Sequence, residues 1–252
     1  MFTTRDGPTA GQGASGRPWD RFNLGDHVGD AAAAVAANRG MLREALAARP
    51  VFLKQVHGTG VAALDADTPD GTEADGAIST QRGLACTMMV ADCLPVLFTN
   101  AAGTAVGAAH AGWRGLAGGI LENTVSFLQA SIESARMDMP SNRDETDEIM
   151  AWLGPCIGPR AFEVGAEVRA AFVENDAGAT ASFKPLGGGK YLADLPALAR
   201  RRLAAAGVTR AYGNDGSSAW CTVTQQGRFF SHRRDQPVLG TTGRMAACIW
   251  RS

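Results

Sequence analysis

The stretch L-A-C-T-M-M-V-A-D-C-L-P-V-L-F-T, residues 84–99, places an acid and a thiol inside an otherwise apolar run. Its apolar segments, Leu84–Val90 and Val96–Thr99, have the length and composition of buried strands. Asp92 and Cys93 should therefore lie at a strand end and point in opposite directions, unless Pro95 or a bulge bends the chain there. A buried cysteine is often only a small hydrophobic residue, and a structural hydrogen-bonding role for Asp92 stays open.

Short β-forming runs flank this stretch on both sides, and helical periodicity occurs in blocks between them. Because the strands cluster instead of alternating strictly with helices, we predict an α+β fold of mixed β-sheets covered by helices, in a single domain over residues 1–252. A Gly/Pro-rich loop at 7–20 and a polar connector at 139–148 interrupt the pattern. Further strands are predicted at 51–56, 61–64, 76–79, 104–109, 149–153, 219–224, 228–231 and 244–250, and helices at 31–48, from 116 onward, around 164–172, and after Asp194 as N-cap.

Composition excludes several classes of partner. The 252 residues include 24 Lys and Arg against 25 Asp and Glu, so the net charge of −1 provides no basic surface for nucleic acid or anionic lipid. No apolar run reaches the roughly 18 residues of a membrane-spanning helix, and the first residues lack the apolar core of a secretion signal. We therefore expect a cytoplasmic protein, monomeric or homodimeric, that binds a small molecule and contacts neither nucleic acid nor membrane.

Two histidines and one cysteine are the candidate chemical groups. His57 and His110 follow apolar runs and adjoin glycines, as expected for side chains that a strand end presents to a cleft. Each alone is more often a structural residue. Together with Cys93, however, they form the three-ligand set of a catalytic zinc site, which leaves one tetrahedral position for water or substrate. The spacing contains no paired metal motif, so it does not establish that the three residues converge.

Seven segments, in order along the chain, resemble one family. They are K-Q-V-H-G-T-G-V, A-D-G-A-I-S-T, V-A-D-C-L-P-V-L-F, H-A-G-W-R-G, W-L-G-P-C-I-G-P-R-A-F-E-V-G, F-F-S-H-R-R-D and T-G-R-M-A-A. In these segments the chain is similar to the laccase-domain family, also labelled polyphenol oxidase or peptidoglycan editing factor and regarded as purine nucleoside phosphorylases. The resemblance implies zinc bound by His57, Cys93 and His110, with copper as the alternative metal. It also implies phosphorolysis of adenosine, inosine and methylthioadenosine, together with adenosine deamination.

Phosphorolysis requires groups that bind an anion. We expect them directly after His110, where Gly112 and Gly115 flank the start of a helix and leave backbone N–H groups free. Arg114 would add a fixed cation there and join the catalytic set. The alternative is that Arg114 only pairs with a surface acid.

Further substrate contacts are predicted near both ends of the chain. Arg233 and Arg234 follow two aromatic residues and are candidates for binding phosphate or ribose, and Arg5 and Asn23 lie in segments similar to the family. The family usually has Tyr where this chain has His232, and residues 236–240 look like an insertion, so we expect an altered pocket rim. Cys221 matches a cysteine typical of the family, with no role assigned by its spacing.

Three other functions fit parts of the sequence. The first is a peptidoglycan-editing hydrolase that acts on cytoplasmic muropeptide precursors. The second is a copper-dependent polyphenol oxidase, for which four histidines are too few to hold several metals. The third is a non-enzymatic, metal-stabilised binding protein, which predicts a closed site with Cys221 or His232 as the fourth ligand.

Overall fold

Strand β4 (Leu84–Val90) is buried along its whole length because it is packed on both faces. In the computed structural model, which describes residues 1–8, 13–137 and 147–252, successive side chains of this strand enter two different cores. Leu84, Cys86 and Met88 pack in the core between two sheets, whereas Ala85 and Met89 pack in the core beneath helix α1 (Ala32–Leu46). The alternation is the one expected of a strand covered on both sides.

Three sheets carry the strands. The largest has the order β11-β7-β5-β6-β3-β2 and mixes parallel with antiparallel pairs, the second has the order β1-β4-β12, and the third has the order β8-β10-β9. The remaining strand bounds are β1 (Arg49–Phe52), β2 (Val61–Ala63), β3 (Gly76–Ser79), β5 (Leu94–Asn100), β6 (Val106–Ala111), β7 (Ile149–Leu153), β8 (Glu163–Val164), β9 (Phe183–Gly187), β10 (Lys190–Ala193), β11 (Arg210–Gly213) and β12 (Met245–Trp250).

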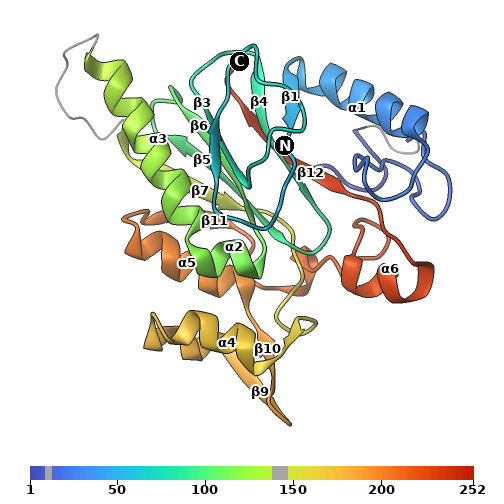
Figure 1. Ribbon diagram of the computed structural model, residues 1–252, viewed down its shortest axis with the longest axis vertical. Helices are drawn as coiled ribbons and strands as arrows, with labels where there is room; N and C mark the ends of the chain where they lie inside the picture. The colour runs from blue at the N-terminus through green and yellow to red at the C-terminus, as the bar shows by residue number, and fades with distance from the viewer. Residues whose placement is uncertain (9–12, 138–146) are drawn as a thin grey trace.

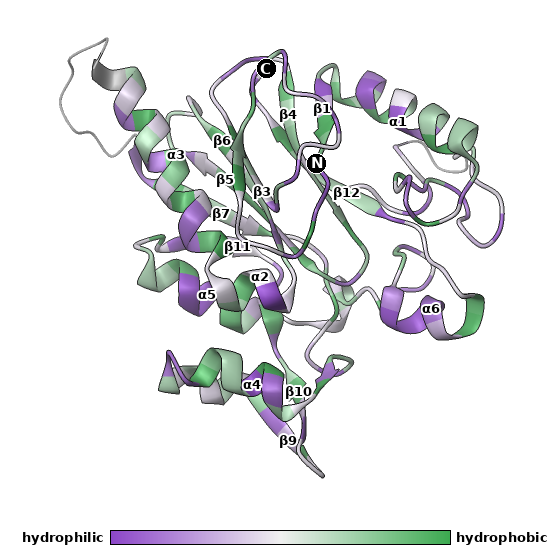
Figure 2. Ribbon diagram, in the orientation of Figure 1, coloured by the Kyte–Doolittle hydropathy of each residue, from purple (hydrophilic) through white to green (hydrophobic). Residues whose placement is uncertain are grey.

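Helices cover the outer faces of the two larger sheets. The helices after α1 are α2 (Trp113–Gly118), α3 (Ile120–Met137), α4 (Ala166–Val173), α5 (Leu195–Ala205) and α6 (His232–Leu239), with short 3-10 turns η2 (Ala177–Ser182) and η3 (Ser218–Trp220). Helix α3 lies on the six-stranded sheet and α1 on the opposite side of the molecule, over β1 and β4 (Figure 1). The central strands are hydrophobic and the covering helices are mixed in polarity (Figure 2). The predicted α+β class is confirmed.

Prediction and structure agree best around β4. The predicted bounds of β3, β4 and β7 match those observed, and Asp194 caps α5 by accepting a hydrogen bond from the N–H of Ala197 at 2.9 Å. The predicted strand at 51–56 ends early, at Phe52. The predicted helix after 116 begins at Trp113 and is divided into α2 and α3 by Gly119, which has a φ of 103°.

Two predicted C-terminal strands are wrong. Residues 219–224 form the end of η3 and a turn, with one isolated bridge from Cys221 to Cys156, and residues 228–231 form no strand. Phe229 and Phe230 are buried in a small apolar cluster with Val90, Ala91 and Met245, so their hydrophobicity reflects packing and not strand pairing. Helix α6 was not predicted because Pro237 lies inside it.

The structure describes only part of the two predicted connecting segments, the Gly/Pro-rich loop at 7–20 and the polar connector at 139–148. Residues 13–20 of the Gly/Pro-rich loop contain no helix or strand, whereas 9–12 of that loop and 139–146 of the polar connector lie outside the described residues. Among the described helices, none has the length and apolar character needed to cross a bilayer.

Candidate metal centre and active-site cavity

Three separate elements bring His57, Cys93 and His110 together. His57 lies in the loop between β1 and β2, Cys93 in the turn between β4 and β5, and His110 near the end of β6. Their potential ligand atoms all lie within 4.8 Å of one another, and the Cys93 Sγ is 3.8 Å from the His57 Nε2. The convergence that the sequence could not establish is therefore present, and the two imidazole rings meet edge to face at 4.8 Å.

The carboxylate of Asp75, which directly precedes β3, fixes both histidines. Its Oδ1 is 2.8 Å from the His110 Nδ1 and accepts the backbone N–H of His57 at 3.0 Å. Its Oδ2 accepts the N–H groups of Val56 and Gly58 at 3.1 and 2.7 Å. Because Asp75 occupies Nδ1, the Nε2 atom of His110 is left as the ligand atom, as is usual for histidines that bind metals.

Asp75 was not singled out from the sequence. It is fully buried, and its carboxyl pKa lies below the usual value because hydrogen bonds from His110 and the 56–58 loop outweigh the effect of burial. The available signal was weak: an acid directly before the buried strand G-A-I-S. The loop it holds includes His57, which has a φ of 60°, a left-handed conformation that is uncommon outside glycine.

In the free protein the cluster pairs a thiolate with a protonated imidazole, and His110 must lose that proton before it can bind a metal. Burial would raise the pKa of the Cys93 thiol, but His110 and His57 outweigh it and lower that pKa to about 6. Burial would likewise lower the pKa of His110, but Cys93 and Asp75 raise it to about 9. The thiolate is the form of cysteine that ligates a metal. The donor set, His–Cys–His with a carboxylate behind one histidine, fits zinc.

The cluster opens into a cavity of about 700 Å³. The three potential ligands differ in exposure: His110 is buried, Cys93 is half-buried and His57 is exposed. One side of the group therefore faces the cavity. The cavity wall combines apolar side chains with cations, which suits a ligand that has both an aromatic and an anionic part. The wall includes Trp113, Ile157, Phe162, His232, Arg233 and Arg244.

Only one of the predicted arginine contacts lies on this wall. Arg233 lines the cavity, and its Nη2 donates to the Glu163 carbonyl at 3.0 Å. The Arg114 guanidinium instead stacks on the Trp113 ring at 4.4 Å, in an exposed position outside the cavity. Arg5 stacks on Phe230 at 4.8 Å and donates to backbone carbonyls, again away from the wall.

Two further predicted contacts are committed to the scaffold. The Arg234 guanidinium pairs with Asp235 and donates to three backbone carbonyls, those of Thr222, Val223 and Phe229. The Asn23 side chain is fully buried, accepts from the N–H of Gly25 and of Arg244, and donates to Asp30. Both residues therefore position backbone around the cavity and do not line it.

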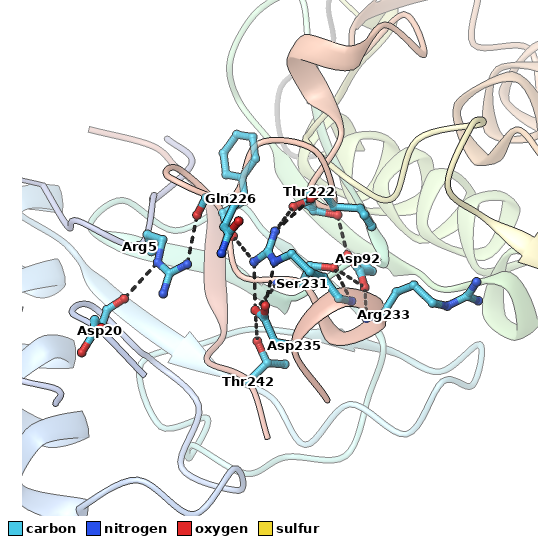
Figure 3. A network of polar contacts seen from close by, with 12 residues as sticks. Arg5, Asp20, Asp92, Thr222, Gln226, Ser231, Arg233, Asp235 and Thr242 are labelled. Carbon is cyan, nitrogen blue, oxygen red and sulfur yellow. Dashed lines mark hydrogen bonds and ion pairs between the residues drawn. The ribbon is translucent and has the colours of Figure 1, made fainter. Parts of the chain in front are cut away.

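Asp92 joins the turn that carries Cys93 to the C-terminal wall. Its φ is 89°, so the chain is not a regular strand there, and the interruption precedes Pro95, which lies within β5. One carboxylate oxygen accepts the Thr222 hydroxyl, and the other accepts the Ser231 hydroxyl at 3.1 Å and the N–H of Arg233 at 2.6 Å (Figure 3). Asp92 is thus a positioning residue for the start of α6.

Cys221 and His232 do not close the metal group. Cys221 is buried and accepts the N–H of Gly158 at 3.3 Å, and His232 faces the cavity without joining the cluster. Within residues 1–8, 13–137 and 147–252, the group holds three potential ligands. This is the open arrangement of a catalytic site, and it contradicts the four-ligand site expected of a binding protein.

Gly112 leaves room for the cluster. A Cβ at this position would lie 3.0 Å from the His57 Cδ2 and 3.1 Å from the Cys93 Sγ, closer than side chains normally approach. Because its φ of −63° and ψ of 158° suit alanine, a Gly112→Ala change acts by crowding alone. We expect zinc affinity to fall on the order of tenfold, measured by competition with a chromophoric chelator. Gly60→Ala, where no atom lies within 4 Å of the added Cβ, is the control and should leave the affinity unchanged.

Comparison with known proteins identifies the family. The sequence profile of the family described as "Multi-copper polyphenol oxidoreductase laccase" matches residues 1–252, and the chain belongs to this family. Among its relatives, the purine nucleoside phosphorylase YfiH of Escherichia coli (strain K12) is 49% identical over 240 residues, covering 94% of this chain and 89% of the relative. A purine nucleoside phosphorylase of Pseudomonas aeruginosa is 47% identical over 249 residues, covering 98% and 91%.

Solved structures agree with this assignment. A Neisseria meningitidis protein matches with a TM-score of 0.85 and 42% identity, covering 100% of this chain and 93% of that chain. YlmD from Geobacillus stearothermophilus matches with a TM-score of 0.80 and 32% identity, covering 99% and 90%. The fold is therefore shared along the whole chain.

Proposed function

We propose that this protein is a zinc-dependent purine nucleoside phosphorylase whose active site is the cavity beside His57, Cys93 and His110. The observation that carries the proposal is an open His–Cys–His group on a cavity of about 700 Å³ lined by cations and apolar side chains. Relatives that align over nearly the whole chain and are named purine nucleoside phosphorylases support it.

The reaction makes defined demands on the cavity. A phosphate oxygen forms a bond to the ribose C1′ while the bond from C1′ to the purine nitrogen breaks, and the base leaves with that electron pair and takes up a proton. The wall can meet these demands, because Trp113, Ile157 and Phe162 offer apolar surface for the base and Arg233 offers a cation for phosphate. When bound, a zinc ion supplies a Lewis acid at the cavity floor.

The substrates proposed are adenosine, inosine and methylthioadenosine. Deamination of adenosine, in which water replaces the amino group at C6, is proposed as a second activity of the same cavity. Multi-copper oxidation is not favoured, because the described residues contain one His–Cys–His group and such enzymes need several metals. No contact in the cavity favours a muropeptide precursor, and release of L-Ser from such a precursor would separate that activity from phosphorolysis.

Purified protein incubated with adenosine and phosphate should release adenine and ribose 1-phosphate, measured by chromatography. His110→Ala removes a ligand, so we expect a loss greater than the roughly 10- to 100-fold typical of changes behind a metal ligand. Elemental analysis should find zinc in the wild type. A chelator should abolish activity, and added zinc should restore it in the wild type but not in the variant.

An unchanged rate in His110→Ala would contradict the role of the cluster. Copper in place of zinc, with oxidation of phenols and no release of adenine, would contradict the proposed activity itself.

A further inference from the structure

Arg244 differs from Arg39, another arginine of the cavity wall, in having no anionic partner among the described residues. Arg39, which also lines the cavity, pairs with Asp26 at 3.1 Å and stacks on Phe52 at 4.0 Å. Arg244 is half-buried, and no Asp or Glu oxygen of the described residues lies within 4.0 Å of its guanidinium. It directly precedes β12, where the sequence interpretation assigned no site residue.

The hydrogen bonds of Arg244 use only part of its guanidinium. Its Nη1 donates to the carbonyls of Thr242 and Gly243, at 3.1 and 3.2 Å, both in its own loop. Its Nε and Nη2 donate to no group in the part of the chain that the structure describes. The stem of the side chain packs over Gly25, where a Cβ would lie 2.7 Å from the Arg244 Cγ, so the guanidinium is directed by a close backbone contact.

The cavity that Arg244 lines also contains the candidate metal group. Arg244, Asp92, Cys93 and His232 line the same cavity. Burial lowers the pKa of Arg244, while Cys93 and Asp92 act in the opposite direction. The Asp92 carboxylate, however, already accepts from Thr222, Ser231 and the N–H of Arg233.

A half-buried cation without a paired anion is unfavourable in the free protein. Such a cost is relieved when a ligand supplies the anion, and the planar guanidinium is suited to two parallel hydrogen bonds with phosphate oxygens. Arg233, also on this wall and also without a carboxylate partner among the described ion pairs, adds a second positive charge. Two arginines without carboxylate partners on one wall, Arg244 and Arg233, favour binding of a doubly charged oxyanion over a neutral ligand.

We propose that Arg244 binds inorganic phosphate in the cavity, through its Nε and Nη2 edge, next to Cys93. This inference deepens the proposed function, on which its catalytic meaning rests, because it identifies where the attacking phosphate is held. It replaces Arg114 and Arg234 of the sequence interpretation, neither of which reaches the cavity. Binding of phosphate itself requires no assumption about the reaction.

The test is phosphate binding by zinc-loaded protein, measured by calorimetry and by the rise in Tm on adding inorganic phosphate. Arg244→Gln keeps much of the side-chain volume and removes the charge and the fork, so the Kd for phosphate should rise about 10- to 100-fold. Arg244→Lys keeps the charge without the fork and should give an intermediate Kd. Arg210→Gln is the matched control, because Arg210 is an exposed arginine of β11 that pairs with Glu148. This variant should bind phosphate like the wild type.

Two further readouts separate binding from stability. In phosphate-free buffer Arg244→Gln should melt no lower than the wild type, since it loses an unpaired charge. In the adenosine assay its KM for phosphate should rise by the same 10- to 100-fold with a smaller change in kcat. If Arg244→Gln does not fold, Arg244→Lys and the wild type carry the comparison.

The outcomes distinguish this proposal from the proposed function. Equal phosphate affinity in the wild type and Arg244→Gln would overturn the assignment of Arg244, even if phosphorolysis occurs. The assignment would also be overturned if adenosine monophosphate bound through Arg244 and inorganic phosphate did not. Arg244 would then bind the phosphate group of a nucleotide substrate. Arg244-dependent phosphate binding without any phosphorolysis would support the site and contradict the phosphorylase.

Discussion

The Asp75→Asn variant is expected to lose about 2–4 kcal/mol of unfolding free energy and, separately, to bind the proposed zinc ion more weakly. Asn has one acceptor oxygen where Asp75 has two, and four donors converge on the carboxylate. In one orientation the amide leaves the loop N–H groups of Val56 and Gly58 unpaired. In the other it faces His110, which must then accept at Nδ1 and carry its proton on Nε2, the atom needed as a ligand.

Urea denaturation and a zinc competition assay measure the two losses. The unfolding free energy is compared in metal-free protein, so that the loss of zinc does not contribute to it, and zinc affinity should fall by about 10- to 100-fold. Asp67→Asn, an exposed acid on a nearby loop, is the control and should change neither quantity. Wild-type stability and zinc affinity in Asp75→Asn would show that the carboxylate does not orient the histidines.

Asp92→Ala is expected to have the second largest effect, a loss of about 2–4 kcal/mol in unfolding free energy. It removes the acceptor for the Thr222 and Ser231 hydroxyls and for the N–H of Arg233. It also places alanine at a φ of 89°, where a side chain without a polar group is disfavoured. Urea denaturation of the purified variants measures the loss.

Two companion variants divide this loss into its causes. Asp92→Asn should be mild, because its oxygen can serve Ser231 and Arg233 while its amide donates to the Thr222 hydroxyl, and Asn tolerates positive φ. Asp92→Gly also removes the carboxylate acceptors, but glycine adopts a positive φ without strain. Its unfolding free energy should therefore exceed that of Asp92→Ala by about 1 kcal/mol. A severe loss in Asp92→Asn together with a mild one in Asp92→Ala would contradict this account.

Local patterns predicted several of the strands around the candidate metal group. The runs that became β3, β4 and β7 are mostly apolar, and each follows a glycine or an acidic residue, so pattern and structure coincide there. The three ligands were found by residue type and by resemblance. Their convergence depends on sheet pairing across the chain, such as Pro95 opposite His110, which no local pattern encodes.

The missed residues act through distant partners. Asp75 is an acid before a strand, and its role arises only because the 56–58 loop and His110 meet it from two sides. Arg244 lies in the motif T-G-R-M, which gives no sign that the side chain lacks an anion. Arg114 and Arg234 were predicted as phosphate contacts because each is a cation within a family-like motif. The Trp113 ring and the Asp235 carboxylate hold their guanidinium groups away from the cavity.

The candidate metal group and part of the cavity wall come from different halves of the chain. All three potential metal ligands precede residue 111, whereas Ile157, Phe162, Arg233 and Arg244 of the cavity wall come from the second half of the chain. The second half of the chain therefore completes a cavity whose candidate metal group is built by the first half, and Asp92 connects the two by accepting hydrogen bonds from Thr222, Ser231 and Arg233. Substitutions after residue 150 can therefore change this part of the cavity wall without changing the three residues of the candidate metal group.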